Sequence, residues 1–145
     1  MKKRSGNNLG VFIFLVSLFT ALSCKEDSHT VTLTYENTLE QTVTVEFLQD
    51  RTMELYDKLV IPPHESKSVS WLRYERETVF EGIDLIRLTF EDGKCVSYHN
   101  NNHEAIGSST NLLNTSSKVY TVENNVLKTK ITEAHYEEAL GGEKS

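Results

Sequence analysis

The sequence predicts an all-β fold, an antiparallel β-sandwich of about seven strands with a short C-terminal helical segment. From residue 30 onward, apolar and polar residues alternate with a period of two, which is typical of strands with one buried face. Turn-forming residues interrupt this alternation at intervals of roughly eight to twelve residues. Residues 24–145 also make one ordinary domain, which is long enough to bury a core without disulfides.

The first two strands are predicted in residues 30–37 and 41–50. Their threonines and valines suit a pleated, half-buried surface. Residues 36–41 are long enough for a hairpin loop between them. The apolar positions that share one face are Val31, Leu33 and Tyr35 in the first strand and Val43, Val45 and Phe47 in the second.

The next two strands are predicted on either side of a proline turn. Residues 53–61 have the pattern of a strand, and Pro62 and Pro63 end it, because proline has no N–H to donate to a sheet. Residues 67–72 resume the extended pattern. The charged residues 73–78 then predict a connection.

A hairpin is predicted around Asp92 and Gly93. Residues 83–90 have the pattern of a central strand that is buried on both faces, and residues 94–99 form the return strand. Gly93 accepts the positive φ that a tight hairpin turn requires. These two strands are therefore expected to be antiparallel neighbours.

The last elements follow a long polar loop, residues 100–117. Residues 118–123 and 125–132 predict a strand pair across the dipeptide at 124–125, because Asn is favoured in turns. Residues 133–140 predict one or two turns of helix. The number and spacing of strands is typical of an immunoglobulin-like or a transthyretin-like sandwich, and the pattern does not choose between them.

The N-terminal 23 residues predict a secretory signal peptide. Lys2, Lys3 and Arg4 form a basic region, and residues 9–22 form a mostly apolar run that ends at the small Ser23. A bilayer-spanning helix needs about twenty apolar residues. The run is therefore short for a permanent membrane span.

The segment Ala21-Leu22-Ser23-Cys24 resembles the lipobox of bacterial lipoproteins. The resemblance implies cleavage between Ser23 and Cys24, a diacylglycerol on the Cys24 thiol and acylation of the new amine. Ala21 departs from the pattern, since Leu is commonest there. The alternative is an ordinary secretory signal that leaves Cys24 as a thiol. One acyl chain binds a membrane reversibly, whereas several make the attachment stable.

The next residues, Lys25, Glu26 and Asp27, resemble the surface-export signal of some Gram-negative lipoproteins. The resemblance implies an outer-membrane protein displayed on the cell surface, with the periplasmic-facing leaflet as the alternative. Cleavage would remove three basic residues and leave 12 basic against 21 acidic residues, a formal charge of −9. Anionic lipids repel such a chain, so the lipid must hold it at the membrane. Nucleic acid is excluded as a partner, because its recognition needs clustered Lys and Arg.

The mature chain also resembles small β-sandwich lipoproteins of Gram-negative gut bacteria. The shared features are the early Thr/Val strand pair, the proline turn, the hairpin at residues 90–94 and the closing segment at residues 131–136. This resemblance implies a fold and no particular activity. The predicted organisation is a signal peptide (1–23), a lipidated tether (24–29), a β-sandwich domain (30–140) and a disordered tail (141–145).

The segment YHNNNHE, which begins at Tyr98, is the most suggestive polar cluster. His99, His103 and Glu104 carry donors that suit zinc. However, two histidines four residues apart share a side only on a helix, and consecutive Asn residues disfavour one. A polar ligand is the second interpretation, with Tyr98 stacked on a sugar and Asn101, His99 and His103 as hydrogen-bonding groups. A solvated loop is the simplest interpretation, and no metal ligands are assigned.

Trp71 and Cys95 each allow two interpretations. Trp71 could form a recognition patch with Arg73, Tyr74 and Arg76, since these residue types dominate interface energetics, or it could fill the core of the sandwich. Cys95 is expected to be a small buried residue and not a nucleophile. A base at His99, four residues along the strand, would lie about 13 Å away at 3.3 Å per residue.

The sequence therefore predicts a lipid-anchored binding or interaction module, without a cofactor, whose partner is a protein or a polysaccharide. It carries no G-x-S-x-G, H-E-x-x-H or phosphate-binding glycine motif, so an enzyme is not expected. One alternative is an envelope inhibitor or immunity lipoprotein, since an acidic surface attracts a basic toxin or enzyme. Another is a glycan-binding accessory protein that presents Trp71 or Tyr98 as an exposed aromatic platform.

Overall fold

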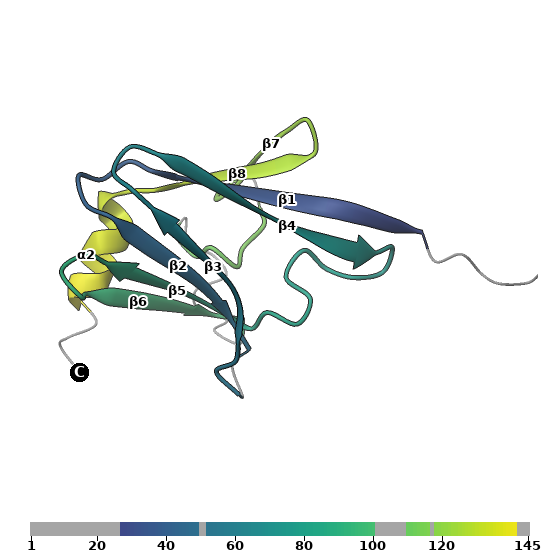
Figure 1. The fold of residues 1–145 in the computed structure, drawn as a ribbon, viewed down its shortest axis with the longest axis horizontal. Helices are drawn as coiled ribbons and strands as arrows, with labels where there is room; N and C mark the ends of the chain where they lie inside the picture. Colours follow the sequence, from purple (N-terminus) through teal and green to yellow (C-terminus); the bar gives the residue numbers. More distant parts are fainter. Residues whose placement is uncertain (1–26, 50–51, 101–109, 117, 142–145) are drawn as a thin grey trace, which may run out of the picture.

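The computed structural model confirms the predicted β-sandwich. It describes residues 27–49, 52–100, 110–116 and 118–141. Within these ranges, eight strands form two four-stranded sheets that pack face to face (Figure 1). None of the helical structure in these ranges is long and apolar enough to cross a membrane.

The first sheet contains the first and the last strand of the described domain. Its strands, in spatial order, are β4 (Ser66–Tyr74), β1 (Ser28–Asn37), β8 (Val126–Ile131) and β7 (Thr121–Glu123). β1 is antiparallel to β4 but parallel to β8. This parallel pair departs from the fully antiparallel prediction, and it arises because the chain passes through the other sheet before it returns beside β1.

The second sheet is antiparallel throughout. Its strands, in spatial order, are β3 (Leu55–Ile61), β2 (Val43–Leu48), β5 (Leu85–Phe90) and β6 (Cys95–His99). The two-residue alternation of β2 places Val43, Val45 and Phe47 in the core, as predicted.

Two turns take the conformations that their residues favour. Gly93, between β5 and β6, has a φ of 85°. Asn124 and Asn125, between β7 and β8, have φ values of 51° and 63°. Two successive positive φ angles give a hairpin turn whose twist matches that of the flanking strands. The hairpins predicted at Gly93 and at residues 124–125 are therefore confirmed. The hairpin loop predicted at residues 36–41 was wrong, because β1 and β2 belong to different sheets.

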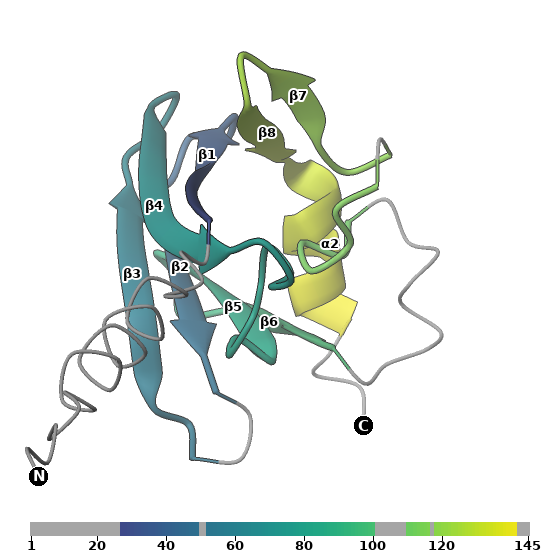
Figure 2. The same cartoon turned by 90° about the vertical axis from the view of Figure 1, so that its right-hand side faces the viewer.

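Helix α2 (Glu133–Gly141) closes one side of the sandwich, and it confirms the predicted C-terminal helix. It packs against β6 and lies between the two sheets in Figure 2. The Tyr136 hydroxyl donates to Oδ2 of Asp92 at 2.7 Å, which ties the helix to the β5–β6 turn and lowers the pKa of the Asp92 carboxyl.

A chain of hydroxyl groups crosses the centre of the core. Tyr120 donates to the Leu112 carbonyl at 2.7 Å, and its oxygen lies 3.0 Å from that of Tyr35. Because the Tyr120 proton is already used, Tyr35 is the donor to Tyr120. The two tyrosines are 0% and 2% exposed, and burial raises the pKa of both.

Asn37 is a fully buried polar residue at the point where the two sheets meet. Its Nδ2 donates to the carbonyls of Gln41, Ile61 and Pro62 at 2.8, 3.0 and 3.1 Å. Its Oδ1 accepts the N–H of Leu39 at 3.1 Å. One side chain thus joins the β1–β2 connection to the end of β3.

Several predicted boundaries were wrong. β1 begins at Ser28, although residues 28 and 29 were assigned to the tether. Helix α2 includes Gly141, which was assigned to the disordered tail. β4 continues to Tyr74, although residues 73–78 were predicted as a connection. The strand extends because Arg73 points inward and is 4% exposed, with Val79 and Glu81 carbonyls accepting its N–H groups at 3.2 Å.

Candidate functional site

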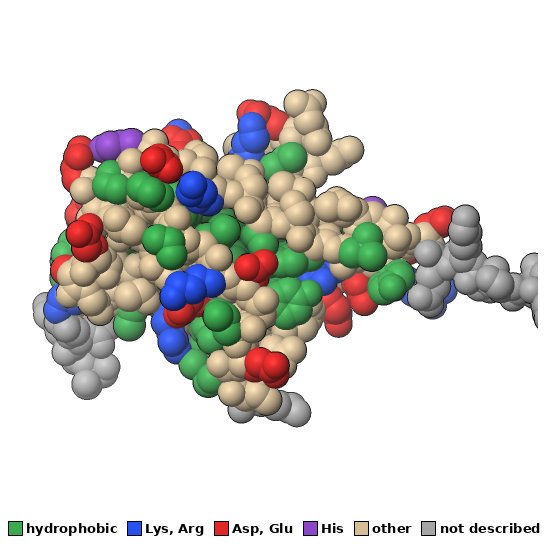
Figure 3. Space-filling view, in the orientation of Figure 1, with side chains coloured by type: hydrophobic (Ala, Val, Ile, Leu, Met, Phe, Trp, Pro, Cys, Tyr) green, Lys and Arg blue, Asp and Glu red, His purple; other side chains and the backbone are tan. Residues whose placement is uncertain are grey.

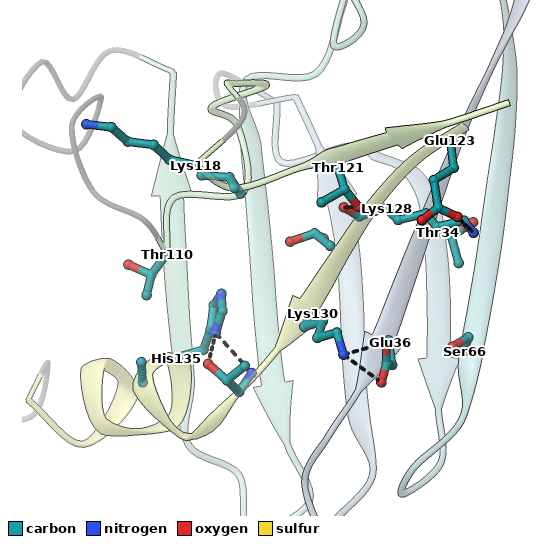
Figure 4. A pocket seen from close by; sticks show the side chains of 14 residues that line it. Thr34, Glu36, Ser66, Thr110, Lys118, Thr121, Glu123, Lys128, Lys130 and His135 are labelled. Atoms are coloured by element: carbon teal, nitrogen blue, oxygen red, sulfur yellow. Dashed lines mark hydrogen bonds and ion pairs between the residues drawn. The ribbon is translucent and has the colours of Figure 1, made fainter. Parts of the chain in front are cut away.

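The described residues contain a groove of about 760 Å³ beside β8, between the approach to β7 and the start of α2. We call it the β8 groove. Figure 4 shows its side chains, which come from strands of the first sheet, from the chain before β7 and from the start of α2. Most of them carry hydroxyl or charged groups. The lining includes Glu36, Thr110, Lys118, Glu123, Lys128, Lys130, Thr132 and His135.

The groove exists because β7 is shorter than β8. Their pairing runs from Glu123↔Val126 to Thr121↔Lys128 and stops there. The carbonyl of Ile131 faces β1, where it accepts the Thr38 N–H at 3.0 Å. Carbonyl directions alternate along a strand, so the backbone of Lys130 faces the other way, toward the groove. In the described chain, no β7 residue lies opposite Lys130, which leaves this part of β8 as an open edge.

His135 forms one end of the groove and caps helix α2. The Thr132 N–H donates to His135 Nδ1 at 3.1 Å, and the His135 N–H donates to the Thr132 carbonyl at 3.0 Å. The first bond is one half of a capping box, with a histidine where Glu or Gln is usual; the other half is absent, because the carbonyl of Thr132 and not its hydroxyl accepts the His135 N–H. Because Nδ1 accepts, the neutral ring carries its proton on Nε2.

The Nε2–H of His135 is a buried donor that makes no hydrogen bond of good geometry with another described residue, although the Thr110 backbone lies close enough to favour the charged ring. The residue is 3% exposed, and within the described structure no acceptor with acceptable geometry reaches Nε2. Burial lowers the pKa of His135, although the Glu138 charge and the nearby backbone of Thr110 favour the charged form. The neutral ring therefore keeps a desolvated donor beside the groove, with the Nε2 atom itself buried.

Three lysines and two carboxylates surround the mouth of the groove. Lys130 pairs with Glu36 at 3.3 Å, and Lys128 pairs with Glu123 at 2.5 Å. Lys118 is exposed and makes no ion pair with another described residue. The positive charges around the groove therefore outnumber the negative ones, although the sequence as a whole is acidic.

Tyr98, predicted as an exposed platform, is buried instead. It is 5% exposed, and its hydroxyl donates to Glu138 Oε2 at 2.8 Å. Burial and the Glu138 carboxylate raise its pKa. Thr110 donates to the other oxygen of Glu138, so this carboxylate ties α2 to β6 and to residue 110. The prediction that a sugar stacks on Tyr98 is therefore wrong.

Trp71 occupies the core, so its interpretation as a surface platform is also wrong. It is 7% exposed, and its Nε1 donates to Asp57 Oδ2 at 3.2 Å. Phe47 and Phe80 lie edge-on to the indole, with ring centroids 5.1 and 6.4 Å away. The Arg73 guanidinium lies 5.3 Å from its centroid. Of the predicted patch, Tyr74 and Arg76 remain exposed.

The other predicted residues are not brought together. His99 is half-buried at the end of β6 opposite Leu85, while Asn101 and His103 lie outside the described residues. Cys95 is exposed, contrary to its predicted burial, because it lies on the solvent side of an edge strand. Ser23, Cys24, Lys25 and Glu26 lie outside the described residues, whereas Asp27 is described.

His135 was not predicted as a site residue, although the sequence carries a signal for it. The pattern Thr-x-x-His at residues 132–135 places a side-chain acceptor three residues after a helix cap, as a capping box does. The open edge of β8 had no comparable signal, since it depends on which strand pairs with which.

Comparison of the chain with protein-family models, with curated proteins and with solved structures gives no match. The candidate site therefore rests on the geometry of the β8 groove.

Proposed function

We propose that the chain is a lipid-anchored protein of the outer membrane that binds an anionic, hydroxyl-rich ligand in the β8 groove. The ligand class is an acidic saccharide. The proposed role is binding and not catalysis. The anchor is proposed from the resemblance of residues 21–27 to a lipobox and an export signal.

The observation that carries the ligand class is the set of three lysines, Lys118, Lys128 and Lys130, among hydroxyl-bearing side chains in the β8 groove. Ammonium groups form charge-assisted hydrogen bonds with a carboxylate, and these are stronger than bonds between neutral groups. His135 lies at the end of the groove with its Nε2 buried, so its ring resonance reports a ligand in the groove.

The volume and the charge of the β8 groove suit an acidic saccharide. The volume of about 760 Å³ lies within the usual range for small-molecule sites. The hydroxyl-bearing lining suits sugar hydroxyls, which both donate and accept. Lys118, Lys128 and Lys130 supply the positive charge that a uronic acid would need.

The test is a titration with an oligoglucuronate and with a neutral oligoglucose of equal length, followed through the ¹⁵N resonance of His135 Nε2. The acidic oligosaccharide should move this resonance and bind at least tenfold more tightly. Lys118→Glu should weaken binding at least tenfold, while Lys58→Glu, on the outer face of the other sheet, should leave it unchanged. An unmoved His135 resonance, or equal effects of both variants, would refute the ligand class.

A basic protein is the second candidate partner, favoured by the formal charge of −9 on the proposed mature chain. This would make the protein an envelope inhibitor or immunity lipoprotein. The affinity for such a partner should fall steeply as ionic strength rises. Lys118→Glu should then leave it unchanged or strengthen it, the opposite of the saccharide result.

A further inference from the structure

β1 and β4 continue as a two-stranded ribbon beyond the body of the sandwich. Their register runs to Ser28↔Tyr74, and the N–H of Glu75 still donates to the Asp27 carbonyl at 3.1 Å. Figure 1 shows this ribbon projecting at the right. We call residues 27–30 and 72–75 the ribbon tip.

The ribbon tip lies very close to the proposed lipid anchor. Three residue steps separate Cys24 from Asp27. At about 3.3–3.6 Å per residue, even a fully extended chain holds the two Cα atoms within about 11 Å of each other. The tip must therefore remain at the membrane surface whenever Cys24 carries lipid.

Two large apolar side chains are exposed at this tip. Leu72 is 58% exposed and Tyr74 is 45% exposed. They lie two residues apart on β4, so they project from the same face of the ribbon. Their partners on β1 are Thr30 and Ser28, which are small and leave them uncovered.

Charged side chains limit how deeply the tip can enter a bilayer. Asp27, Glu75 and Glu77 stand beside the exposed Arg76, and Glu77 accepts the Tyr74 N–H at 3.0 Å. Figure 3 shows apolar and acidic side chains together at this projecting end. Carboxylates are costly in hydrocarbon, whereas tyrosine is enriched at the membrane–water interface. The composition fits the headgroup layer.

We propose that the ribbon tip is the membrane-contacting end of the domain, with Leu72 and Tyr74 seated in the interfacial layer of the leaflet that holds the Cys24 lipid. This inference rests on the proposed anchor. It fixes the orientation of the domain, because α2 lies at the opposite end of the long axis in Figure 1. The end of the β8 groove formed by His135 is then directed away from the membrane.

The test uses the lipidated protein in phosphatidylcholine vesicles whose acyl chains are brominated close to the glycerol. Cys95→Ser removes the exposed native thiol. Leu72→Cys in that background carries a bimane fluorophore, and Leu140→Cys on α2, which is 41% exposed, is the matched control. Brominated lipid should quench the fluorophore at position 72 at least threefold more than the one at position 140.

Vesicle flotation separates failure of this inference from failure of the anchor. Protein that floats with the vesicles but shows equal quenching at both positions overturns the proposed orientation and leaves the anchor standing. Protein that does not float overturns the anchor, and the orientation with it. Flotation with selective quenching at position 72 supports both.

Discussion

The Thr132 N–H donates to His135 Nδ1 at 3.1 Å, so the side chain that caps α2 is also one that can titrate. The pKa of His135 is lowered, chiefly because burial disfavours the charged ring. The unfolded chain therefore binds this proton more readily than the folded protein. The contribution of His135 is stabilising above its unfolded pKa of about 6.5 and is lost as pH falls toward the folded pKa.

His135→Gln should remove this pH dependence. Glutamine at this position can still accept the Thr132 N–H but cannot titrate. Denaturant unfolding of the two proteins should give similar stabilities at neutral pH, and below about pH 6.5 the wild type should lose more stability than the variant. Parallel losses in both proteins would contradict the role of His135, since the remaining groups, Glu138 and Tyr98 among them, are common to both.

Asn37→Ala should destabilise the fold by about 3 kcal/mol, because it leaves buried backbone groups at both sheet connections without partners. Thr34→Ala is the control. This change removes the exposed hydrogen bond between the hydroxyl groups of Thr34 and Ser68, whose oxygens are 2.8 Å apart. It should lower the free energy of unfolding by less than about 0.5 kcal/mol. Chemical denaturation measures both. Equal midpoints for Asn37→Ala and Thr34→Ala would show that Asn37 does not hold the two sheets together.

The hydrogen-bond directions assigned to Tyr120 and Tyr35 predict that replacing each tyrosine with Phe lowers the free energy of unfolding by a different amount. Tyr120→Phe leaves both the Leu112 carbonyl and the Tyr35 hydroxyl unpaired and should cost about 2–3 kcal/mol. Tyr35→Phe leaves the bond from Tyr120 to Leu112 intact and should cost about 1 kcal/mol. A larger loss of unfolding free energy for Tyr35→Phe would reverse the assigned direction of the hydrogen bonds.

Replacing Lys25, Glu26 and Asp27 with Ala should keep the protein in the membrane fraction but remove its accessibility to protease on intact cells. The domain should still fold, because Asp27 contributes its backbone carbonyl, not its side chain, to the pair with Glu75. Protease accessibility is measured with and without permeabilised outer membranes. Persistent cleavage of the variant on intact cells would rule out the export signal.

The sequence predicted the strands and turns better than the surface. Alternation placed Val43, Val45 and Phe47 in the core because burial of one face imposes a period of two. The turns at Gly93 and Asn124 followed from local backbone preference. Such features depend on neighbouring residues alone.

Features that depend on distant pairing were not predictable in the same way. Cys95 is exposed because β6 is an edge strand. The residues near Cys95 do not indicate which strands lie at the edge of a sheet. Tyr98 is buried because α2, some forty residues later, brings Glu138 to its hydroxyl. The β8 groove likewise depends on where β7 stops.

The proposed lipid on Cys24 would fix where the domain stands and which way it faces, and the intact mass of the purified mature protein tests this proposal most directly. The chain should begin at Cys24 and carry the added mass of a diacylglycerol and, after full processing, an amide-linked acyl chain. A mature N-terminus without fatty acyl mass, or one that begins at another residue, would contradict the anchor and the orientation proposed for the ribbon tip.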